Sequence, residues 1–85
     1  MEEVAIGMVE KYFGKIGVAA IKITSSELKV GDKIHIKGHS TDFEQQVDSM
    51  QVEHQSVQTA GPGAEVGIKV KEKVHEKDTV FVVKG

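Results

Sequence analysis

Apolar and polar residues alternate at every second position over much of this chain, which is the period of a β-strand with one buried face. Glycine-rich turns separate the alternating segments, and the strongest turn signals are Gly14-Lys15-Ile16-Gly17 and Ala60-Gly61-Pro62-Gly63. The pattern therefore predicts strands joined by tight turns. The clearest strands are expected over residues 3–13, 18–24, 33–37, 65–71 and 79–83.

Residues 43–57 fit no single period. Val47 and Met50 have helical spacing, whereas Met50 and Val52 have strand spacing. A β-bulge, which is an extra residue in one strand, changes which alternate positions face inward and would explain this pattern. Residues 55–59 have little helical character. We expect one long, bent strand here, which brings the number of strands to six.

The apolar residues are mainly β-branched, with 13 Val and 7 Ile against one Leu and five Ala. Side chains of this kind suit a pleated sheet better than a helix. The 85 residues contain no repeat and no linker, so we expect one all-β domain over residues 1–85. Since an open sheet of this size would expose two edges, the expected architecture is a small six-stranded closed Greek-key β-barrel.

Composition and charge exclude several classes of protein. The chain has no Cys, so it has no disulfide, thiolate metal site or Cys nucleophile. No apolar run approaches the roughly 18 residues of a membrane-spanning helix, and the acidic start Met1-Glu2-Glu3 is unlike a signal peptide. We expect a soluble, cytoplasmic protein with no membrane contact. Met1 and the strand near residue 83 favour a complete gene product.

The charge balance argues against a basic nucleic-acid clamp. The formal net charge is −2, and all 11 cationic side chains are Lys. Without Arg, the planar fork that best binds guanine edges and phosphates is missing.

Four histidines raise the question of a metal site: His35, His39, His54 and His75. His35 and His39 have the spacing of zinc ligands on a helix, but a predicted strand and turn would place them about 13 Å apart if extended. Surface histidines explain the pattern better. We therefore expect no metal and no cofactor.

No pattern indicates an enzyme. The hydroxyl residues are scattered over loops, and no nucleophile elbow is present. Nothing in the spacing brings two carboxylates together. The turn at residues 14–17 lacks the phosphate-loop spacing and precedes a strand, so no nucleotide is expected. We predict no catalytic residue.

Two features are candidates for binding. The lysines of residues 69–77 form the densest basic cluster, but acidic residues interleave with them, which is typical of a solvated face. Tyr12 and Phe13 could form a stacking platform for a base. Aromatic residues are few, so we expect one of this pair to pack in the core.

The order of several motifs resembles domain 2 of the translational GTPases, the β-barrel that follows their G domain. These motifs are Leu28-Lys29-Val30-Gly31-Asp32-Lys33-Ile34, Val47-Asp48-Ser49-Met50-Gln51-Val52-Glu53-His54, Ala60-Gly61-Pro62-Gly63-Ala64-Glu65-Val66-Gly67-Ile68 and Val74-His75-Glu76-Lys77-Asp78-Thr79-Val80. Small stand-alone elongation factor-like proteins look similar, and similar barrels occur at the end of U32-type peptidases.

The resemblance implies a non-enzymatic binding module without GTPase activity. In the aminoacyl-tRNA-carrying factors, two residues of this barrel help to hold the aminoacylated 3′ end, and their positions fall at Gln51 and His54. The implied partner is the ribosome or RNA, contacted by Gln51, His54, Lys69, Lys71 and Lys73. The alternative is a protein–protein adaptor related to the U32-type barrel.

Overall fold

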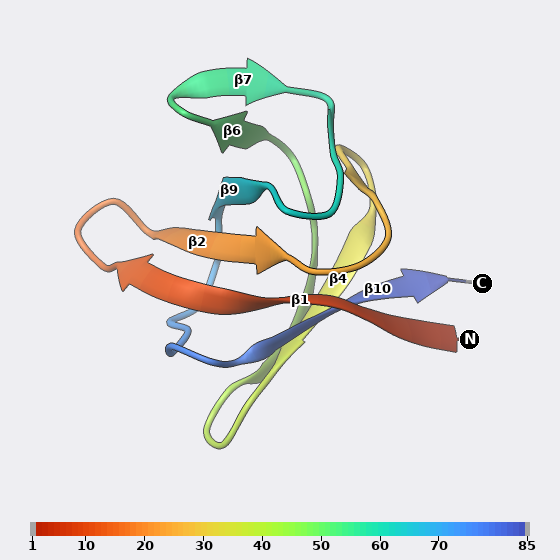
Figure 1. Cartoon of the computed structure of the whole chain (residues 1–85). Coiled ribbons are helices and arrows are strands. Elements are labelled where there is room, and N and C mark those ends of the chain that lie inside the picture. Colours follow the sequence, from red (N-terminus) through yellow and green to blue (C-terminus); the bar gives the residue numbers. More distant parts are fainter. Residues whose placement is uncertain (1, 85) are drawn as a thin grey trace.

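The computed structural model describes residues 2–84, and every regular element in that range is a β-strand. This confirms the all-β prediction. None of the described residues belongs to a helix long and apolar enough to cross a membrane. The strands are β1 (Glu2–Phe13), β2 (Val18–Ile23), β3 (Leu28–Lys29), β4 (Lys33–Lys37), β5 (Asp42–Gln46), β6 (Met50–Val52), β7 (Gln55–Val57), β8 (Thr59–Ala60), β9 (Glu65–Lys69) and β10 (Thr79–Lys84) (Figure 1).

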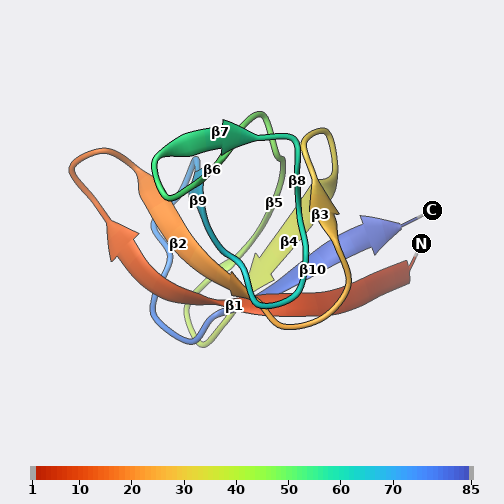
Figure 2. The same ribbon diagram turned by 45° about the horizontal axis from the view of Figure 1, so that its top comes forward.

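Eight strands form one antiparallel sheet in the order β5-β4-β10-β1-β2-β9-β6-β7, and β3 pairs with β8 separately. The long strand β1 lies at the centre of this order and pairs with β10 on one side and β2 on the other. The sheet curls on itself, as Figure 2 shows, and encloses a cluster of buried apolar side chains. The register Glu2↔Lys84 places the two ends of the described chain side by side.

The prediction of a closed six-stranded barrel is wrong. Within residues 2–84 the sheet has eight strands, and β5 and β7 are its two edges, with no backbone ladder between them. The chain leaves the sheet after β5 and re-enters it at the other end of the strand order as β6. Its backbone at this crossing bonds to a loop instead: the Val47 N–H donates to the Asp32 carbonyl, and the Gly31 N–H donates to the Val47 carbonyl.

A side chain bridges part of the open seam. The Gln45 amide nitrogen donates to the Lys69 carbonyl at 2.8 Å, and its amide oxygen accepts from the Lys71 N–H at 2.9 Å. Gln45 thus bonds to the backbone at the end of β9 and just after it, as the backbone of a neighbouring strand would. This contact depends on residues 24 and 26 positions apart, so no local sequence pattern could have indicated it.

The long bent strand expected over residues 43–57 is also wrong. This stretch forms β5, then β6 and β7, which are joined by a tight turn at Glu53 and His54. Both turn residues have positive φ values, 52° and 65°. Such turns usually carry Asn-Gly or Asp-Gly, so the sequence lacked the customary hairpin signal.

The core is built from the inward positions that the alternation predicted. Ile34 and Ile36 of β4 are fully buried, as expected, and the β1, β2 and β9 strands bury Ile6, Ile21 and Ile68 against them. The opposite face of β2 and β9 is directed outward. That outer face carries the site described next.

Candidate functional site

The outer face of the sheet carries a shallow hollow with a volume of about 420 Å³ over β2, β9 and β6. Its floor is low because the outward side chains there are small. Ala20 and Gly67 are direct partners across β2 and β9, and Gln51 is the partner of Gly67 on β6. The hollow is lined by Phe13, Ile16, Val18, Ala20, Gln51, Glu53, His54, Glu65, Val66 and Gly67.

One wall of the hollow is apolar and exposed. Phe13 ends β1, Ile16 lies in the following turn, and the two residues are 42% and 64% exposed. The turn is fixed by the Gly17 N–H, which donates to the Phe13 carbonyl at 2.9 Å. The Lys11 ammonium lies 5.3 Å from the centroid of the Phe13 ring. Large apolar side chains gathered at the rim of a hollow are typical of a binding surface.

The opposite wall is the β6–β7 turn, and its backbone is strained. Glu53 and His54 both have left-handed φ values although neither is glycine. Each such residue costs roughly 1 kcal/mol or more, and such strain is found preferentially at functional sites. The turn holds the Glu53 and His54 side chains beside the floor formed by Gly67 and Gln51.

The rim of the hollow is acidic. Glu53 and Glu65 line it, and Glu10 lies against Glu65. A hydrogen bond to the Glu65 carboxyl, helped by burial and by the Glu65 charge, raises the pKa of Glu10, whereas nearby Lys22 opposes this shift. The mutual repulsion of two neighbouring carboxyl groups would be relieved by a cation placed between them. The hollow therefore combines an apolar floor with a rim suited to positive charge.

The structure divides the residues singled out from the sequence between different surfaces. Gln51 and His54 lie together in the hollow. Lys69 and Lys71 line a second hollow of about 500 Å³ beside Gln45. Lys73 is exposed and lines neither of the two.

The two aromatic residues at the end of β1 lie in different environments, as expected. Tyr12 packs against the core, and Phe13 faces the hollow. The sequence analysis missed Ile16, Val18 and Ala20 as site residues. These three apolar residues occupy outward positions of β2 and the turn before it, where a solvated face would carry polar residues. That departure from the usual pattern could have indicated a binding surface.

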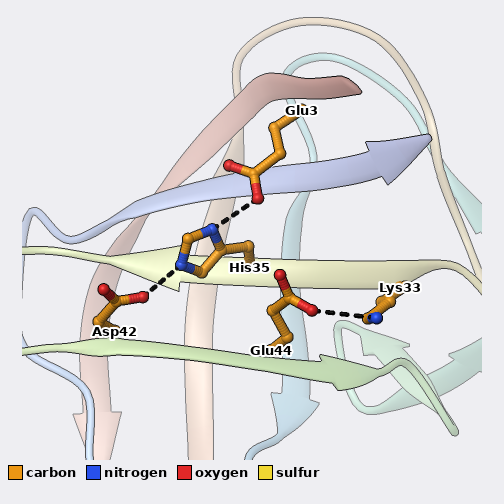
Figure 3. Close-up of polar contacts among 5 residues, drawn as sticks. All are labelled: Glu3, Lys33, His35, Asp42 and Glu44. Carbon is orange, nitrogen blue, oxygen red and sulfur yellow. Dashed lines mark hydrogen bonds and ion pairs between the residues drawn. The ribbon is translucent and has the colours of Figure 1, made fainter. Parts of the chain in front are cut away.

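A second polar cluster lies at the other end of the sheet, around His35 of β4 (Figure 3). The His35 Nδ1 atom lies 2.8 Å from Glu3 Oε2, and its Nε2 atom lies 2.5 Å from Asp42 Oδ1. The side chain is only 13% exposed, and its ring lies 6.0 Å from that of Phe81. His35 is therefore not the surface histidine that the sequence analysis expected.

The two carboxylates set the protonation of His35. The hydrogen bond to Asp42, followed by that to Glu3, raises the pKa of His35 above 6.5, although burial opposes the shift. The same contact with His35 lowers the pKa of Asp42 below 3.8. A raised histidine pKa stabilises the fold below the unfolded value and loses this contribution as the pH rises through the folded value. The lowered Asp42 pKa contributes above 3.8 and is lost as the pH falls further.

This leads to a pH prediction. In buffer with a chelator, the stability contributed by His35 is expected to be complete near pH 5.5 and to decrease as the pH is raised to 8.5. Urea denaturation at both values measures it, and the decrease should be smaller in His35→Gln than in the native chain. The exposed His39, replaced in His39→Gln, serves as the control. An equal decrease in native and His35→Gln protein would contradict the assignment.

A third cluster has the residue types of a hydrolase but not the geometry. Thr41 Oγ1 lies 3.0 Å from His75 Nδ1, and Asp78 Oδ2 lies 3.9 Å from that same nitrogen. In a catalytic triad the histidine uses one nitrogen for the hydroxyl and the other for the carboxylate. Thr41 is also buried, with 3% exposed. The cluster ties the β4–β5 turn to the segment before β10.

Comparison with known proteins finds relatives that are named as a collagenase and a protease. The chain is 38% identical over 81 residues to a collagenase of Porphyromonas gingivalis, and 39% identical over 83 residues to an uncharacterized protease of Methanocaldococcus jannaschii. These matches cover 94% and 96% of this chain. The chain spans only about a fifth, 20%, of the length of each of these relatives. No protein-family model matches it.

The fold agrees with these relatives. The C-terminal domain of a Geobacillus thermoleovorans protein assigned to the U32 peptidases superposes with a TM-score of 0.87, covering 94% of this chain and 92% of that domain at 20% identity. The chain therefore has the fold of that C-terminal domain, and the alternative in the sequence analysis, a barrel related to that of U32-type peptidases, is supported. The resemblance to domain 2 of translational GTPases was wrong as an assignment, because the relatives are a collagenase and a protease.

Proposed function

We propose that this chain is a non-catalytic module that binds an extended polypeptide segment in the hollow over β2, β9 and β6. The segment carries an apolar side chain flanked by Lys or Arg. The observation that supports this is the combination of an exposed apolar wall, a floor of Ala20 and Gly67, and an acidic rim.

The chemistry of the hollow favours this occupant in two ways. The apolar side chain would cover the exposed rings and methyl groups of Phe13 and Ile16, at about 25 cal/mol for each Å² of apolar surface removed from water. The flanking cations would approach Glu53 and Glu65 and relieve the carboxyl pair formed by Glu65 and Glu10.

The relatives support a polypeptide over a nucleic acid as the occupant. Their names describe a collagenase and a protease, and this chain matches about a fifth of each of them. We infer that the module holds a polypeptide next to the remainder of such an enzyme. An acidic rim also disfavours phosphate, since like charges repel at close approach.

Fluorescence anisotropy with labelled nine-residue peptides tests the proposal. One peptide has a central Leu between lysines in a Gly/Ser background, and its partner has glutamates in place of the lysines. The lysine peptide is expected to bind at least tenfold more tightly, and the difference should decrease with added salt. Glu65→Gln should weaken binding of the lysine peptide and leave that of the glutamate peptide unchanged or improved.

A single-stranded oligouridine of ten nucleotides, measured at low salt, provides the competing outcome. Equal affinity for both peptides, or tighter binding of the oligouridine than of either peptide, would contradict the proposal. Weak binding of the oligouridine is expected because no lysine is among the residues that line the hollow.

A further inference from the structure

The cluster around His35 has the composition of a metal site on the outer face of the sheet. Three strands contribute to it: Glu3 comes from β1, His35 from β4 and Glu44 from β5. His35 and Glu44 are direct partners across β4 and β5. Glu3 reaches across β10 to the imidazole, as Figure 3 shows. One ligand atom from each of the three residues lies within 4.8 Å of the other two.

Asp42 orients the imidazole in the way that metal sites require. Its carboxylate bonds to His35 Nε2 from the side opposite Glu3 (Figure 3). A ligating histidine usually gives its other ring N–H to a carboxylate, which fixes the tautomer and directs the free nitrogen at the metal. With the proton on Nε2, the lone pair of Nδ1 is directed toward Glu3 and is available as a ligand.

The surrounding charges favour a divalent cation. The carboxylates of Glu3, Asp42 and Glu44 surround one imidazole. Two ammonium groups lie near them: Lys33 forms an ion pair with Glu44 at 3.0 Å, and Lys37 is the strand partner of Asp42. Lys33 is half exposed, with 51% of its side chain accessible, so it can move aside into water. A doubly charged ion would replace it and balance the two ligand carboxylates.

We propose that this cluster binds one Zn²⁺ through His35 Nδ1, Glu3 and Glu44, with Asp42 as the orienting carboxylate. Nitrogen and carboxylate oxygen at about 2.0–2.2 Å are ordinary zinc ligands, and three protein ligands leave a fourth position for water. Tetrahedral ligand atoms at those bond lengths are roughly 3.3 Å apart. Binding would therefore draw the two glutamate carboxylates, which are partly exposed, closer to the imidazole than they lie now.

Zinc bound here would link the start of β1 to the edge strand β5. These two strands are separated by β10 and β4 in the sheet. The ion is therefore expected to stabilise the folded chain, since a ligand that binds only the folded state raises its stability with concentration. This inference concerns residues outside the polypeptide-binding hollow and does not depend on the function proposed for it.

The test is isothermal titration of the full chain with zinc chloride at pH 7.5, after removal of metal with a chelator. We expect one site, a rise in melting temperature with zinc, and at least a tenfold loss of affinity in His35→Gln. His39→Gln, which changes an exposed histidine on the turn after β4, should bind zinc as the native chain does. Far-ultraviolet circular dichroism establishes that each variant is folded.

A second variant distinguishes the loss of a zinc ligand from an indirect effect of the His35 substitution on folding. Glu44→Gln keeps the size of a glutamate and lies on an edge strand, so it should remain folded while losing affinity for zinc. No heat of binding and no thermal shift in the native chain up to millimolar zinc would overturn the proposal. Undiminished binding by His35→Gln, or an equal loss in His39→Gln, would also overturn it.

Discussion

Replacing Gly7 by alanine is expected to lower the free energy of unfolding by about 2–4 kcal/mol, because the added methyl group has no room. A Cβ atom at this position would lie 2.1 Å from the backbone carbonyl oxygen of Lys22. Gly7 is buried where β1 changes register against β10, and it also pairs with Ile23 of β2. Relief of the overlap would require separation of β1 from β2 at the centre of the sheet.

Thermal or urea denaturation measures this loss. For a domain of this length, the melting temperature should drop by more than about 10 °C. Gly61→Ala is the matched control, because no atom lies within 4 Å of a Cβ placed there and its φ is not left-handed. Its stability should remain within about 1 kcal/mol of the native value. A Gly7→Ala protein as stable as Gly61→Ala would contradict the packing described for β1 and β2.

Filling the floor of the hollow is expected to weaken binding of the lysine-flanked peptide at least tenfold. Gly67→Val places a branched side chain between Ala20 and Gln51, where the apolar side chain of the peptide is proposed to lie. A Cβ at Gly67 meets Val18 Cγ1 at an ordinary contact distance of 3.5 Å. Valine also suits a strand better than glycine does, so the fold should be retained or stabilised. Peptide anisotropy and thermal denaturation measure the two effects together.

Two further variants make this result specific. Gly67→Ala fills less of the hollow and should weaken binding by a smaller factor than Gly67→Val. Lys71→Ala changes an exposed side chain at the neighbouring hollow and should alter the affinity by less than about threefold. Unchanged affinity in a folded Gly67→Val protein would show that the peptide binds elsewhere.

The alternation of apolar residues was sufficient to predict most of the sheet. Ile34 and Ile36 are buried where period two placed them, and the turn at residues 14–17 lies between β1 and β2 as expected. This works because each inward side chain must be covered regardless of which strand lies beside it. The order of the strands in the sheet could not be predicted in this way, since it depends on contacts between residues far apart in the sequence.

The errors in the fold have that cause. The Gln45 side chain bonds to the backbone at Lys69 and Lys71, and this long-range contact bridges a seam that the sequence analysis expected a ladder to close. The β6–β7 turn was missed because Glu53 and His54 are not the Asn-Gly or Asp-Gly pair that usually marks such a turn. The β6–β7 ladder, with pairs from Met50↔Val57 to Val52↔Gln55, closes that turn.

The candidate site could be predicted only in fragments. Gln51 and His54 were singled out through a resemblance whose family assignment was wrong, yet they lie together in the hollow. Glu3 and His35 are 32 residues apart, so their contact could not be found from spacing. Side chains converge in the hollow and around His35 because β1, β4 and β9 belong to one curled sheet. The curvature of that sheet has no local sequence signal.

The most direct test of the central claim is an isotope-filtered nuclear Overhauser experiment on the native chain bound to the lysine-flanked peptide. The proposed binding mode predicts contacts from the leucine methyl groups of the peptide to the Ala20 methyl group and the Phe13 ring. Contacts confined to the surface around Lys69 and Lys71, or no contact at Ala20 and Phe13 under saturating peptide, would contradict the claim that this hollow is the binding site.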